Sequence, residues 1–177
     1  MTLRLWLLVP GLATVDALAE PWQKLYAHST IVATLVLFGH LAGLVVAAAL
    51  TFTTEASALR LDPADDSERR RYLRVAAASR RASGVALVVA MSFGILLFLA
   101  DLEAFVVSPV FWAKMSFIVL LLGNVLVASR IDARLGSEDE TPAQRRDRLW
   151  RRRRASAWAA AVLWFALLLC GSALASH

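Results

Sequence analysis

Residues 37–44 read LFGHLAGL, and they lie in the middle of an apolar run from about residue 29 to residue 53. About 20 apolar residues in a helix are enough to cross a lipid bilayer, so this run is long enough to span one. An ionisable histidine at its centre, His40, would be costly in lipid, and such residues are candidates for function by default. The segment therefore predicts a membrane helix with a candidate site halfway along it.

Three further apolar runs have a comparable length. They cover residues 83–100, 110–129 and 155–176, and their only charge, Lys114, lies near the start of one of them. The whole chain is 59% hydrophobic, against about 45–50% in soluble proteins, and its mean hydropathy is +0.60. We therefore predict an all-α fold, a polytopic membrane four-helix bundle that residues 28–177 form as two tandem hairpins.

The first 27 residues precede the bundle and need a separate interpretation. Residues 1–19 combine Arg4, a short apolar stretch and small residues, as a secretory signal peptide does. Pro10-Gly11 and Asp16 interrupt the apolar stretch, so it is too short to cross a bilayer. We predict that residues 1–27 are retained as an N-terminal interfacial or re-entrant helix on the outer face of the membrane.

Arginine is concentrated in two of the connections between the apolar runs. One group lies at positions 60–81 and the other at 130–154, whereas the connection DLEAFVVSP at 101–109 has only acidic charges. Loops rich in Lys and Arg stay on the cytoplasmic side of a membrane, so we predict that both chain termini face outward. This rule explains the arginines without nucleic acid as a partner. We expect the run at its end to contact anionic lipid head groups: Arg151, Arg152, Arg153 and Arg154.

Both arginine-rich connections contain a helix-start pattern. DPAD at 62–65 and TPAQ at 141–144 place a capping residue before a proline, with an acceptor side chain three residues on. We therefore predict that the second and fourth spanning helices begin in the cytoplasm. RRAS opens a span at 80–83 and again at 153–156, which favours a tandem repeat of hairpins in the same orientation. The alternative is a chance match between two arginine-rich flanks.

Small residues recur at every fourth position in the first two spans. The rows are Gly39, Gly43, Ala47 and Thr51 in the first span and Ala82, Ala86, Ala90 and Gly94 in the second. Four-residue spacing places each row on one helix face, where small side chains let two helix backbones approach closely. We predict close packing of the two helices along these rows. The alternative is an accident of the high alanine content.

Two interpretations of His40 follow from its depth in the first span. In one, His40 binds haem b or copper with Met91 as a second ligand, because a thioether suits Cu(I) and His/Met pairs ligate haem. In the other, a neutral His40 forms a hydrogen bond with Ser92 or Asn124 and no cofactor is bound. A rise of about 1.5 Å per residue places all of these side chains in one middle layer, so both interpretations stay open.

A second candidate metal site lies at the outer surface. It would combine His28, at the start of the first span, with His177 at the chain end, near Lys114 and Cys170. The single cysteine excludes an internal disulfide. Nothing indicates a hydrolase or a transferase, since the sequence has no glycine-rich phosphate loop, no metalloprotease helix motif and no pair of carboxylates inside a span.

Three features occur together between residues 35 and 130: HLAG at 40–43, Glu55 as an acid fifteen residues after the histidine, and GILLFLADLEAFVVSPVFWAKMSFIVLLLGNVLVASR at 94–130. With these features the segment resembles an uncharacterised bacterial family of four-helix membrane proteins. That family is similar to the CopD-type copper-resistance proteins and, more distantly, to the HemJ type. Its recurrent positions fall here on His40, Gly94, Lys114 and Asn124. The resemblance implies a bundle in the bacterial inner membrane that is concerned with metal or haem.

This chain departs from the family pattern in two places. It has EASALR at 55–60 where the family usually has Asp followed by Leu-Arg, and NVLVASR at 124–130 has no histidine where the HemJ type has one.

Two hypotheses of function from different classes result. In the first, a small inner-membrane protein handles copper or haem through His40. In the second, a non-catalytic accessory subunit packs against a larger respiratory or photosynthetic membrane complex. The lipid bilayer is a partner in both, and several tryptophans near the span ends (Trp22, Trp112, Trp150 and Trp158) fit anchoring at its surface.

Overall fold

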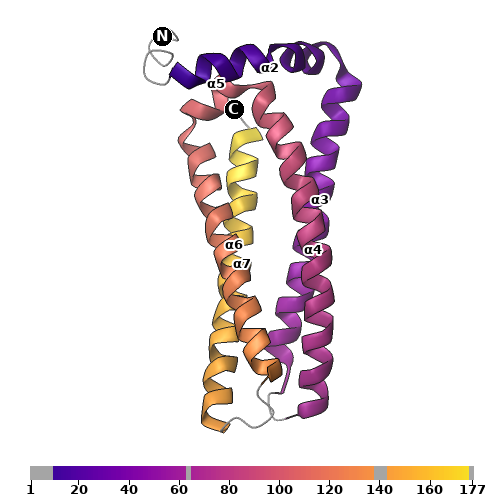
Figure 1. Cartoon of the computed structure of the whole chain (residues 1–177), viewed down its shortest axis with the longest axis vertical. Coiled ribbons are helices and arrows are strands. Elements are labelled where there is room, and N and C mark those ends of the chain that lie inside the picture. The colour runs from indigo at the N-terminus through magenta and orange to yellow at the C-terminus, as the bar shows by residue number, and fades with distance from the viewer. Residues whose placement is uncertain (1–9, 63–64, 138–142, 176–177) are drawn as a thin grey trace. The chain divides into compact units, whose positions relative to one another are not determined.

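The computed structural model describes residues 10–62, 65–137 and 143–175, and every element in these ranges is an α-helix (Figure 1). This result confirms the predicted all-α class. The helices are α2 (Pro10–His28), α3 (Thr30–Arg60), α4 (Asp66–Ala100), α5 (Leu102–Val107), α6 (Pro109–Ser137) and α7 (Ala143–Ala175).

Four of these helices, α3, α4, α6 and α7, are long and apolar enough to cross a membrane by length and composition. Only 6–22% of the residues in their most apolar windows are buried within the chain. Most of these apolar side chains therefore face outward, which is the opposite of a water-soluble bundle and is expected where lipid is the solvent. The prediction of four helices of spanning length is confirmed.

The helix ends follow the sequence signals with one shift. Asp65 caps α4, because its Oδ1 accepts hydrogen bonds from the backbone N–H of Ser67 at 2.8 Å and of Glu68 at 3.2 Å. The pattern DPAD had indicated Asp62 as the cap, so the helix begins one turn later than predicted. Pro63 and residues 138–142 lie outside the described residues. From their first described residues, α4 and α7 run unbroken through the arginine-rich stretches into the apolar ones, as predicted.

The contacts divide the chain into two compact units, and the division cuts through α3 and α4. The first unit comprises Met1–Val45 and Ala86–Ser108, and the second comprises Val46–Val85 and Pro109–His177. The boundary after residue 27 that the sequence suggests does not coincide with this division, and it stays a prediction.

In the first unit, α3 and α4 approach each other closely at a glycine. A Cβ atom added at Gly43 would lie 2.9 Å from the carbonyl oxygen of Ala86 and 2.9 Å from the backbone nitrogen of Ala90. Such a separation is possible only without a side chain, which is why small residues recur on this face. In the same unit, the indole N–H of Trp22 donates to the carbonyl oxygen of Leu96 at 2.9 Å and ties α2 to α4.

In the second unit, α6 and α7 pack side by side (Figure 1). The buried core lies toward the helix ends that carry the arginine-rich connections. It consists of Ala58, Leu61, Tyr72, Ala76, Ile131, Leu135, Leu149 and Trp150. The rings of Tyr72 and Trp150 pack at 5.7 Å between centroids. Three charged side chains of this unit are also buried, those of Arg69, Asp132 and Arg153.

Candidate functional site

Asp132 on α6 is the centre of a buried group of charged side chains in the second unit. Its side chain is 1% exposed. Its carboxylate accepts hydrogen bonds from Nη1 of Arg80 on α4 and from Nε of Arg153 on α7, the latter at 3.1 Å. The hydroxyl of Tyr72 also points at it, 3.4 Å from Oδ2. Three donors from two other helices therefore hold this anion in place.

Arg153 joins the second carboxylate to the group. Its side chain is fully buried, and its Nη1 donates to Oε2 of Glu55 on α3, whose side chain is 12% exposed. The guanidinium carbon lies 5.9 Å from the centre of the Tyr72 ring, within reach of a cation–π contact. We call Glu55, Tyr72, Arg80, Asp132 and Arg153 the charge cluster.

The charge cluster is neutral as a whole, since two guanidinium groups face two carboxylates. It contains one or more residues from each of the four long helices of the second unit. Taking these charges out of water is costly, and their mutual attraction offsets that cost only when the geometry is good. Removal of one partner leaves an uncompensated buried charge, which typically costs about 3–5 kcal/mol. The cluster therefore makes the four helices depend on one another.

Two smaller polar contacts lie next to the charge cluster, one in each hairpin. Ser83 on α4 lies 3.3 Å from the hydroxyl of Thr51 on α3. Ser156 on α7 donates to Asn124 on α6 at 2.9 Å, and the amide of Asn124 donates back to the carbonyl oxygen of Ser156 at 3.0 Å. In both hairpins the two partners are 32 positions apart in the sequence.

Sequence reasoning missed the charge cluster. Arg153 was expected at lipid head groups together with its neighbours, but it is buried; Arg151 and Arg152 are exposed, and Arg154 donates to the carbonyl oxygen of Leu61 at the end of α3. Helical rotation of about 100° per residue turns one of several consecutive side chains inward. A usable signal was present, since Glu55 and Asp132 are the only acids in α3 and α6.

His40 lies between α3 and α4 in the first unit. Its ring Nδ1 is 2.7 Å from the carbonyl oxygen of Ala90, and because a carbonyl only accepts, Nδ1 carries the proton in this bond. A Cβ at Gly94 would lie 3.0 Å from Cε1 of the ring, so glycine makes room for the imidazole. The sequence had suggested Ser92 or Asn124 as partners of this ring. The Ser92 hydroxyl instead donates to the carbonyl oxygen of Val88 in its own helix, and Asn124 is bonded to Ser156.

The other candidate ligands differ in their exposure and in their partners. Met91 is 45% exposed. His28 ends α2 instead of starting the first spanning helix, and its Nδ1 lies 2.8 Å from the carbonyl oxygen of Lys24. His177 lies outside the described residues. Within the described part of the chain, no group of three or more His, Cys, Asp or Glu side chains is placed to hold a metal ion.

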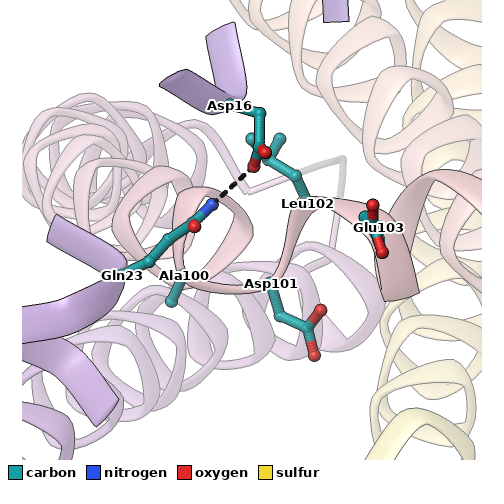
Figure 2. Close-up of a pocket in the computed structure, with 6 residues that line it drawn as sticks. All are labelled: Asp16, Gln23, Ala100, Asp101, Leu102 and Glu103. Carbon is teal, nitrogen blue, oxygen red and sulfur yellow. Dashed lines mark hydrogen bonds between the residues drawn. The ribbon is translucent and has the colours of Figure 1, made fainter. Parts of the chain in front are cut away.

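A pocket in the first unit is lined by three acids, but they do not converge. Asp16, Gln23, Ala100, Asp101, Leu102 and Glu103 line it (Figure 2). Asp16 accepts from the amide of Gln23 at 2.8 Å, and Asp101 accepts from the backbone N–H of Ala104 as the cap of α5. Figure 2 shows the carboxylate of Asp101 directed away from that of Asp16. Asp16 and Asp101 thus complete local structure, and among the described residues no three acids are placed to hold a metal ion.

Comparison with known proteins adds no further assignment: no family model, no curated protein and no solved structure matches this chain.

Proposed function

We propose that this chain is an integral protein of a bacterial inner membrane, similar to the CopD-type proteins, and that it handles copper or haem through His40. The observation that carries the proposal is the bond between Nδ1 of His40 and the carbonyl oxygen of Ala90. Histidines that bind metals usually donate their other ring N–H to a carbonyl or carboxylate, which fixes the tautomer and the ring orientation.

In this proposal His40 is the imidazole ligand of the site. With Nδ1 engaged as a donor, Nε2 is the atom that would bind the metal. Met91 follows Ala90 directly, so at about 100° per residue it lies on the flank of the α4 face that contacts the ring. Copper or haem bound there would supply one-electron chemistry, and the protein residues would hold and orient it.

The membrane arrangement in this proposal has α3, α4, α6 and α7 crossing the bilayer, with both termini outside. The length and apolar character of the helices support the crossing, and the distribution of arginine supports the orientation. α2 lies in the outer interface in this arrangement: Trp22 ties it to α4, and Leu18 and Leu25 are 78% and 51% exposed. Arg151 and Arg152 reach the lipid head groups on the cytoplasmic side.

The test is an optical spectrum with metal analysis of the purified protein, its His40→Gln variant and its His40→Leu variant. We expect a haem band or stoichiometric copper in the wild type and neither in the two variants. His28→Gln is the matched control, because His28 is exposed at the end of α2 and bonds within its own helix; it should keep the cofactor. A colourless, metal-free wild type that co-purifies with membrane partners would overturn the proposal in favour of an accessory subunit.

A further inference from the structure

One nitrogen of the buried Arg153 guanidinium group lacks a hydrogen-bond partner among the described residues. A guanidinium group has five N–H donors in a planar fork, and it binds a carboxylate best through two parallel bonds. Arg153 uses Nε toward Asp132 and Nη1 toward Glu55. Its Nη2 is buried and has no hydrogen-bond partner among the residues that the structure describes. Glu55 therefore accepts a hydrogen bond from only one of the two nitrogens of the Nη1–Nη2 fork.

The two carboxylates of the charge cluster are held very differently. Asp132 is 1% exposed and faces three donors. Glu55 is 12% exposed, and in the described part of the chain its carboxylate is held by Arg153 alone. Because fewer bonds hold Glu55, its carboxylate is the member of the cluster that can leave at the lowest cost.

We infer that the Nη1–Nη2 fork of Arg153 is a binding site for the carboxylate of a small organic acid, and that the carboxylate of Glu55 occupies this site when no such acid is bound. When Glu55 withdraws, an external carboxylate takes its place and makes two bonds where Glu55 makes one. This inference does not depend on His40 or on any bound metal.

The surroundings of the fork favour this ligand. Arg153 is fully buried and packs near Tyr72, so a charged hydrogen bond made there is stronger than one made in water. Asp132 stays in place and fixes the guanidinium from the Nε side. Exposed arginines on the same part of α7, Arg151 and Arg152, attract anions toward this end of the helices. The fork can bind either a carboxylate or a phosphate through two parallel bonds, but a carboxylate is smaller and brings less charge into a buried place.

The experiment is chemical rescue of Glu55→Ala, measured as the thermal unfolding midpoint of the full chain in detergent micelles. Sodium formate, acetate and phosphate are compared with sodium chloride at equal ionic strength. We expect Glu55→Ala to lower the midpoint, and formate and acetate to restore more than half of the loss in a saturable manner. Chloride should restore little, and phosphate less than formate.

Two controls make the result specific. Glu55→Gln fills the space of the glutamate side chain, so it should show no rescue by formate. Glu55→Ala combined with Arg153→Lys removes the fork while keeping the charge, so formate should again have no effect. An unchanged midpoint in Glu55→Ala, rescue by chloride to the same extent, or rescue in either control would overturn the inference. Equal rescue by phosphate would contradict the assignment of a carboxylate as the ligand.

If Glu55→Ala does not fold alone, it is purified in the presence of formate and, in parallel, of chloride. The measured quantity is then the fraction of monodisperse protein recovered with formate and with chloride. A recovery that requires formate supports the site, and equal failure in both salts overturns it.

Discussion

Substitution of Gly43 by alanine tests the closest contact between α3 and α4. The added Cβ would lie 2.9 Å from a carbonyl oxygen, a backbone nitrogen and the Cβ of Ala90. Carbon atoms in contact prefer about 3.5–4.0 Å, so the helices must separate by about 0.6 Å or more, because backbone atoms cannot rotate away. A gap of about 0.5–1 Å forfeits a quarter to a half of the dispersion energy of the contacts that it opens.

The expected magnitude combines two opposing effects. Overpacking of this kind costs about 1–3 kcal/mol, whereas replacing glycine by alanine within a helix gains about 0.8–1.0 kcal/mol in helix propensity. We therefore expect Gly43→Ala to reduce the free energy of unfolding by about 1 kcal/mol. Gly123→Ala on α6 is the matched control, because a Cβ there meets nothing within 4 Å, and it should stabilise the protein.

The assay is reversible unfolding in mixed micelles, followed by circular dichroism for the wild type and both alanine variants. The two substitutions should shift the unfolding free energy in opposite directions. If Gly43→Ala stabilised the protein as much as Gly123→Ala does, the backbones of α3 and α4 would not be in contact at this position, and the argument from rows of small residues would fail.

Three further predictions concern the second unit and the orientation of the chain. Asp132→Asn should lower the free energy of unfolding by about 3–5 kcal/mol, because the buried Arg153 and the half-buried Arg80 lose their shared counter-ion; a loss as small as that of an exposed Asp→Asn change would contradict the charge cluster. A double-mutant cycle of Asn124→Leu and Ser156→Ala should give a coupling energy of about 0.6–1.7 kcal/mol in micelles, and additive effects would mean that the two side chains do not interact. A reporter fused after His177 should be active only outside the cytoplasm and one inserted at Glu138 only inside, and the reverse pattern would invert the proposed topology.

The fold could be predicted because it depends on the lengths of apolar runs. The acidic connection after Ala100 is visible in the sequence, and the structure ends a helix there. The start of α4 was misplaced by one turn, because Asp62 and Asp65 are both suitable caps and only the three-dimensional contacts choose between them. Local chemistry thus fixes the existence of an element better than its first residue.

The site could be predicted only in part, because position along a helix is easier to derive than direction around it. The depth of His40 follows from a rise of about 1.5 Å per residue, and depth alone allowed Ser92 and Asn124 as partners. The ring instead points at the α4 face that carries Ala90 and Gly94. The same difficulty applies to Arg153, which differs from Arg152 only in its direction around α7.

The structure also bears on the interpretation of the two RRAS segments. Their first arginines, Arg80 and Arg153, both donate to Asp132. Their serines each bond across their own hairpin to a partner 32 positions away, Ser83 with Thr51 and Ser156 with Asn124. Positively charged flanks of any sequence would satisfy the positive-inside rule, but that rule does not require the two serines to bond across their hairpins at the same sequence separation. These shared contacts favour a duplicated hairpin over a chance match.

The acids do not follow this symmetry. A strict repeat would give each arginine its own carboxylate in an equivalent place, whereas Asp132 serves both arginines and Glu55 serves only Arg153. The second hairpin therefore supplies the anion that fixes the cluster, and the first hairpin supplies one that is held by a single residue. A buried network in which one member is held less firmly than the rest has a defined place where it can open. In this protein that place is the contact between Glu55 and Arg153, where an external carboxylate would have to enter.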